Sequence, residues 1–153
     1  MFQRIQTVYL ILALILMSLL YFLPLASLVC GGVANVDFYV YGIPKGMIPN
    51  VETPIVWTNI TIVSLIITLL LLTIVKYKKR MMQIRLCFLN IVLMLGSVFL
   101  FWYNIGEQTE ILKAVMTYSM PMIFPFIAVI LTYLAVRGIG KDEALIRSMD
   151  SIR

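Results

Sequence analysis

Hydrophobic residues fall in four long runs along the chain, and charged residues gather between the runs rather than inside them. The runs cover about 5–28, 54–75, 86–104 and 117–136, and none contains an Asp, Glu, Lys, Arg or His. A helix of about 20 residues, rising about 1.5 Å per residue, crosses a hydrocarbon core of about 30 Å. The pattern predicts an all-α membrane protein with one domain, residues 1–153, and four transmembrane helices.

The distribution of positive charge indicates where the connections lie. Most Lys and Arg residues stand at Arg4, within 76–85 or within 137–153, whereas only Lys45 and Lys113 occur in the other two connections. Cytoplasmic loops of membrane proteins carry an excess of Lys and Arg. We therefore expect both termini, the central loop and the tail 137–153 in the cytoplasm, with two loops on the outer side.

The composition supports a membrane location and argues against several other classes. Hydrophobic residues make up 62 % of the chain, and the mean hydropathy is +1.02, above the usual soluble range. The net charge of +5 follows from the topology, so we predict no nucleic-acid partner. The chain has no His, and Cys30 and Cys87 fall at opposite ends of predicted spans, too far apart for a disulfide. We expect no metal and no cofactor.

The first outer loop carries the only strand signals. Residues 36–41 alternate and are rich in β-branched and aromatic side chains, which predicts a strand. A second extended piece over 47–51 would complete a short β-hairpin. We expect it to cap the helices beside an aromatic belt that contains Trp57, Trp102 and Tyr103.

Several residues inside the runs predict how the helices pack. One face of the second helix carries small and hydroxylated side chains, which favour close helix contacts in membranes. Its residues are Trp57, Thr61, Ser64 and Thr68. Gly96 predicts a close crossing in the third helix. Pro121 and Pro125 predict a kink in the fourth, and Gly138 and Gly140 predict C-terminal caps that end it.

The runs lack the groups that catalysis or ion transport needs. General acid–base chemistry requires titratable side chains within reach of one another, and the spans offer only hydroxyls and amides. Ion-coupled carriers place an ionisable residue at depth, and none occurs here. We therefore predict a non-enzymatic protein. Two functions stay open: an accessory or scaffold subunit of a larger membrane assembly, or a carrier or binder of lipid or hydrophobic molecules gated by the kinked fourth helix.

The tail after residue 140 is expected to form another helix on the cytoplasmic side. Leu145, Met149 and Ile152 form a narrow apolar stripe, and Glu143 and Arg147 are an i,i+4 pair. Such a helix can lie on the inner leaflet or dock against a cytoplasmic partner.

The two ends of the chain carry a family resemblance. The opening 1–7 (MFQRIQT) and the closing 141–153 (KDEALIRSMDSIR) resemble a family of small four-span inner-membrane proteins of Bacteroidota, catalogued as a domain of unknown function. Ser151 departs from it, since related tails carry a basic residue there. The resemblance implies a bacterial inner-membrane location with both termini inside, and it brings no activity.

We expect the polar head, the central basic cluster and the charged tail to form a surface for a protein partner or membrane lipid, and a homo-oligomer stays open. The candidate residues of this surface are Gln3, Arg4, Gln6, Lys76, Lys78, Lys79, Arg80, Lys141, Asp142, Glu143, Arg147, Asp150 and Arg153.

Overall fold

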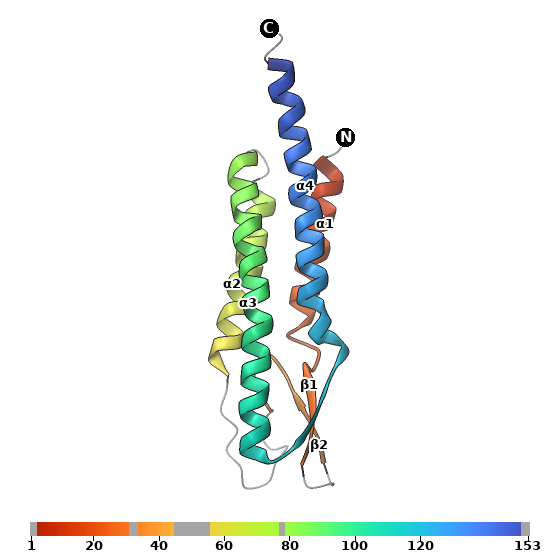
Figure 1. Cartoon of the computed structure of the whole chain (residues 1–153), viewed down its shortest axis with the longest axis vertical. Helices are drawn as coiled ribbons and strands as arrows, with labels where there is room; N and C mark the ends of the chain where they lie inside the picture. Colours follow the sequence, from red (N-terminus) through yellow and green to blue (C-terminus); the bar gives the residue numbers. More distant parts are fainter. Residues whose placement is uncertain (1–2, 31–33, 45–55, 77–78, 151–153) are drawn as a thin grey trace.

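Four helices run up and down beside one another, and a small sheet closes one end of the bundle (Figure 1). The computed structural model describes residues 3–30, 34–44, 56–76 and 79–150. The elements are α1 (Gln3–Leu19), β1 (Ala26–Cys30), β2 (Ala34–Phe38), α2 (Trp57–Val75), α3 (Arg80–Leu112), β3 (Val115–Tyr118), the 3-10 helix η1 (Met120–Ile123) and α4 (Phe124–Asp150). We call the end with the strands the sheet end and the end with both chain termini the terminal end.

Three segments of the described chain are long and apolar enough to cross a membrane. They are Trp57–Val75, Arg80–Ile111 and Met120–Lys141, and 28 % of each hydropathic window is buried inside the bundle. Many large apolar side chains of these helices are exposed, which is consistent with a membrane protein whose surroundings are lipid. α1 is also apolar but shorter, with 17 residues.

Buried residues follow one spacing in all four helices. Successive buried residues stand three or four positions apart, so each helix turns a single narrow stripe toward its neighbours. The stripes are Gln6, Leu10, Ala13 and Met17 in α1; Asn59, Val63, Ile66, Leu70 and Thr73 in α2; Gln83, Cys87, Asn90, Met94, Ser97, Phe101, Ile105 and Gln108 in α3; and Ala128, Thr132, Ala135 and Ile139 in α4. This spacing is typical of left-handed bundles whose helices cross at about 20°. Each helix packs against two others, in the closed order α1, α2, α3, α4.

The first hydrophobic run folds as two different elements. The prediction of one helix to residue 28 was wrong, because α1 ends at Leu19 and β1 begins at Ala26. Pro24, which has no N–H to donate, stands between them. In β1, Ala26 and Leu28 are fully buried, whereas the Ser27 hydroxyl donates a 3.0 Å hydrogen bond to Asp37 of β2.

The sheet has the order β2-β1-β3, and both pairs are antiparallel. A hairpin in the first connection is therefore confirmed, but it is made by β1 and β2 rather than by 36–41 and 47–51; the latter segment lies outside the described residues. β3 comes from the connection between α3 and α4. By pairing with β1, which follows α1, β3 ties the α3–α4 connection to the first half of the chain at the sheet end.

The fourth helix begins later and ends later than expected. Pro121 lies in η1, and Pro125 is the second residue of α4, where a missing N–H costs little. The two prolines therefore start the helix rather than kink it. α4 also continues through Gly138 and Gly140 to Asp150, so neither glycine ends it. In Figure 1 this last part extends beyond the other helices at the terminal end.

Two packing predictions were also wrong. The hydroxyl face of α2 is exposed, and Thr61 and Thr68 donate to carbonyls one turn back in their own helix. Ser64 alone reaches another element, through a 2.7 Å hydrogen bond with the Tyr21 hydroxyl. Gly96 is exposed, and a Cβ added to it would meet no atom within 4 Å, so it makes no close crossing.

Candidate functional site

The predicted partner surface is partly visible at the terminal end. Lys76, Lys79 and Lys141 are exposed, and Arg80 is half-buried, with its Nη1 atom enclosed and without a hydrogen-bond partner. The remaining predicted residues contribute backbone only or lie outside the described chain. Gln3, Arg4, Asp142, Glu143, Arg147 and Asp150 belong to helices, with their side chains outside the description, and Lys78 and Arg153 lie outside it entirely.

Gln6 does not belong to that surface. Its side chain is 8 % exposed and lies against Gly138 of α4. A Cβ built on Gly138 would stand 3.0 Å from Gln6 Cγ and 3.2 Å from its Nε2. Gly138 therefore serves the close approach of α1 and α4, which explains why a glycine stands inside a continuing helix.

A polar stripe runs along the buried face of α3. Gln83, Asn90, Ser97 and Asn104 follow one another at seven-residue intervals, so they occupy the same position of the helical repeat. The first three are buried, with Asn90 and Ser97 at 0 % exposure, and Asn104 is half-buried. The Ser97 hydroxyl is satisfied within its own helix, by a 2.7 Å hydrogen bond to the Met94 carbonyl. The mostly apolar interior of the bundle thus contains a line of polar side chains on α3.

Two asparagines of this interior differ sharply in their hydrogen bonding. Asn104 Nδ2 donates to Asn59 Oδ1 at 2.8 Å, which ties α3 to α2 near the sheet end. Asn90 is as fully buried as Asn59, yet neither its Nδ2 nor its Oδ1 has a hydrogen-bond partner. An enclosed polar group without a partner costs about 1–3 kcal/mol. A single buried asparagine in a helical seam can nevertheless specify which helices pair and in which register.

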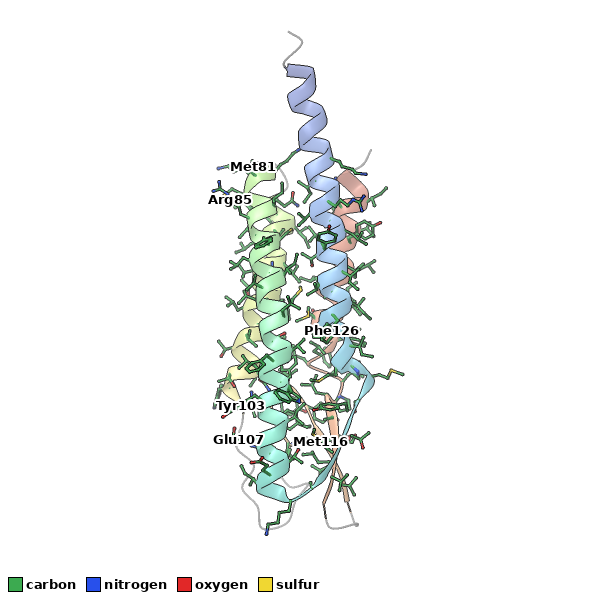
Figure 2. The ribbon with its side chains drawn as sticks, in the orientation of Figure 1. Met81, Arg85, Tyr103, Glu107, Met116 and Phe126 are labelled. Carbon is green, nitrogen blue, oxygen red and sulfur yellow. The ribbon has the colours of Figure 1, made fainter. Side chains whose placement is uncertain are left out.

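A groove lies between α3 and β3 at the sheet end. Its volume is about 400 Å³, and it is lined by Trp102, Tyr103, Gly106, Glu107, Glu110 and Met116. Figure 2 shows Tyr103 and Glu107 one turn apart along α3, with Met116 at about the same level on the strand side. The aromatic residues stand toward the middle of the bundle and the carboxylates toward its end. The groove therefore combines apolar ring surface with negative charge.

Within the part of the chain that the structure describes, no three His, Cys, Asp or Glu residues come together as metal ligands. The groove offers carboxylates, rings and a thioether, and the polar stripe offers amides and a hydroxyl. These groups can hold a ligand or a neighbouring helix by hydrogen bonds, ring contacts and charge.

Sequence reasoning missed the stripe and the groove for different reasons. The seven-residue interval from Gln83 to Asn104 is visible in the sequence and could have predicted one buried polar face. The groove depends on β3, which stands beside α3 only because it pairs with β1, far away in sequence. Tyr103 and Trp102 were predicted to belong to an aromatic belt, and their place in a groove had no sequence signal.

Comparison with known proteins places the chain in a family. A family model described as "Domain of unknown function (DUF4293)" matches residues 2–152. The match covers nearly the whole chain, and the chain therefore belongs to that family. A search of curated proteins found no match.

Proposed function

We propose that this member of the DUF4293 family is a non-enzymatic accessory or scaffold subunit of a larger assembly in the bacterial inner membrane. The observation that supports the proposal is the length of α4. Its 27 residues extend for about 40 Å, and its last part reaches beyond the helices it packs against (Figure 1). A helix that leaves its bundle in this way offers a binding surface to another molecule.

This last part of α4, the arm, is short for a helix that stands alone. Residues 141–150 make about three turns, and isolated helices of that length are marginal in water. The packed part of α4 supplies the helical nucleus. A partner that covered the stripe of Leu145 and Met149 would stabilise the rest. Glu143 and Arg147 give the neighbouring face charges of both signs, which suits a protein partner with a mixed polar rim.

The proposal includes four crossings with both termini in the cytoplasm. α1 is about 25 Å long and runs beside α4 within the same bundle, so its apolar surface is best accommodated at the same depth as the other three. The basic cluster of the α2–α3 turn and the start of α1 lie at the same end (Figure 1). Reporter fusions test this arrangement: a tag on the last residue should be inaccessible from outside intact cells, and labelling there would contradict it.

The partner hypothesis is tested by affinity purification in mild detergent. The full chain should bring a defined protein with it, and a chain lacking residues 141–153 should lose that protein while staying folded. A finer variant is Leu145→Ser with Met149→Ser, which interrupts the stripe. Its matched control is Ala144→Ser on the neighbouring face, which should keep the partner. A monodisperse protein with no co-purifying partner in either length would refute the proposal.

The carrier alternative is the weaker of the two. It relied on a kink within the fourth helix as a gate, and Pro121 and Pro125 stand instead at the helix start. The scaffold function needs no such gate and uses the one element that leaves the bundle.

A further inference from the structure

The position of the groove along α3 determines its depth relative to the membrane. This helix has 33 residues and is about 50 Å long, whereas a hydrocarbon core is about 30 Å thick. Trp102 and Tyr103 stand about 33 Å from Arg80, so their rings fall at the level of lipid headgroups when Arg80 lies at the opposite interface. Glu107 and Glu110 follow one to two turns further out, where water and headgroups meet.

The aromatic side of the groove is accessible to a ligand. Trp102 is 56 % exposed and Tyr103 is 60 % exposed. The Trp102 ring also packs against Phe99, with centroids 6.2 Å apart and a tilt of 49°, which restrains its orientation. An indole or phenol ring held in this way attracts a cation to its face.

The floor of the groove is open backbone. Gly106 stands between the rings and the carboxylates, and a Cβ added there would meet no atom within 4 Å. The opposite wall is Met116 of β3, whose Sδ is 3.6 Å from the Thr109 hydroxyl. The space of about 400 Å³ lies within the range of small-molecule sites.

Two carboxylates of the groove stand on the same helix. Glu107 and Glu110 are three positions apart on α3, a spacing at which like charges destabilise a helix. Both are exposed, and neither forms an ion pair with any residue that the structure describes. A cation seated between them would relieve this repulsion. The rings and the thioether of the groove supply no oxygen ligand for a hard metal ion, whereas they offer apolar surface to the carbon substituents of an organic cation.

We propose that this groove binds an organic ammonium group, carried by the headgroup of phosphatidylethanolamine or by a soluble amine. The ammonium lies between the two carboxylates, and its carbon substituents rest on Trp102 and Tyr103. The site does not depend on the partner-binding arm of α4, which lies at the terminal end, nor on which side of the membrane the sheet faces.

Two variants remove the site by different means. Glu107→Gln with Glu110→Gln takes away the charge and keeps the shape. Gly106→Leu fills the groove and keeps the charge. The matched control for Gly106→Leu is Gly96→Leu, which adds the same bulk at an exposed position of the same helix that has equally open surroundings.

The lipid source is tested with the full chain in vesicles of equimolar phosphatidylethanolamine and phosphatidylglycerol. Native mass spectrometry after gentle release should show phosphatidylethanolamine retained in preference to phosphatidylglycerol. Both groove variants should reduce that preference by about tenfold, the loss expected from removing a strong charge contact. Gly96→Leu should retain it.

The soluble source is tested by fluorescence titration with ethanolamine and with choline in non-ionic detergent. The chain has 2 Trp, so Trp57→Phe leaves Trp102 as the reporter, and Trp102→Phe leaves Trp57 as the control. A saturable signal from Trp102 alone, weakened by the glutamine pair, supports an amine site. Retention of phosphatidylethanolamine without this signal assigns the site to lipid, and the reverse assigns it to a soluble amine.

Three results would overturn the proposal. One is the absence of both kinds of binding, and another is binding that the glutamine pair leaves unchanged. The third is saturation by Ca²⁺ or Mg²⁺ with no response to ethanolamine or choline. Each can be distinguished from failure of the scaffold function, because deletion of 141–153 leaves the groove intact.

Discussion

Asn90 allows a quantitative test of the bundle interior. Its carboxamide is fully buried in the seam of α3, and neither polar atom has a hydrogen-bond partner. Replacing it by leucine, a side chain of similar size, removes the cost of enclosing those atoms, which is about 1–3 kcal/mol. Part of that gain is offset by imperfect packing of the branched side chain. We expect Asn90→Leu to raise the free energy of unfolding by about 1–2 kcal/mol.

Asn59 provides the matched comparison. It is as fully buried as Asn90, but its Oδ1 accepts the 2.8 Å hydrogen bond from Asn104, while its Nδ2 has no partner. Asn59→Leu therefore loses one hydrogen bond and relieves one enclosed donor. The two effects oppose each other, and the free energy of unfolding should stay within about 1 kcal/mol of the wild type. A double-mutant cycle between Asn59 and Asn104 should give a coupling of about 0.6–1.7 kcal/mol.

The assay is reversible unfolding in mixed micelles, with sodium dodecyl sulfate as the denaturant and far-ultraviolet circular dichroism as the signal. Coincident transitions by Trp fluorescence would justify a two-state treatment. The reasoning is refuted if Asn90→Leu lowers the free energy of unfolding by more than about 1 kcal/mol, since a satisfied amide then occupies that position. Increased stability together with loss of a co-purifying partner would instead identify Asn90 as a residue kept for specificity.

Three further predictions concern other positions. Gly138→Leu should lower the free energy of unfolding by about 1–3 kcal/mol because the new side chain collides with Gln6, whereas Gly140→Leu, with no atom within 4 Å of its Cβ, should change it little. Cys87 is fully buried, so N-ethylmaleimide should alkylate it much more slowly in the folded protein than after denaturation, as mass spectrometry of a chain without the other cysteine can show. Desolvation by burial and, as a smaller cause, the charge of the stacked Tyr39 raise the pKa of Tyr41 above 10.0. The folded state then keeps the phenol proton to higher pH than the unfolded state, so the free energy of unfolding should decline above about pH 10. The decline should be less steep in Tyr41→Phe.

The helices themselves were largely predictable, because long apolar runs without charge have few other folds. The second run, 54–75, nearly coincides with α2, and the third lies wholly within α3. The helix ends were less predictable. α3 continues to Leu112 through Glu107 and Glu110, where hydropathy no longer indicates a membrane helix, and it ends only where Lys113 adopts a left-handed conformation with φ 47°.

The predicted strand over 36–41 overlaps β2, whereas β1 could not be predicted from the local sequence, for a physical reason. Ala-Ser-Leu-Val-Cys at 26–30 continues an apolar run, and nothing local distinguishes it from the end of a helix. Its strand conformation comes from pairing with β2 on one side and β3 on the other. The candidate groove could not be predicted from the sequence for the same reason, since one of its walls is Met116 of β3.

The pairing of β1 with β3 also orders events during synthesis. Ala26 pairs with Tyr118, 92 positions later in the chain. In a chain inserted as proposed, β1 and β2 leave the translocation machinery as a hairpin without a third strand. The edge of β1 that pairs with β3 stays unpaired until the second pair of helices, α3 and α4, has followed. A nascent chain arrested before Val115 keeps that edge open to proteases and to strands of other chains. The connection between α3 and α4, which is exported last, thus completes the sheet by supplying β3.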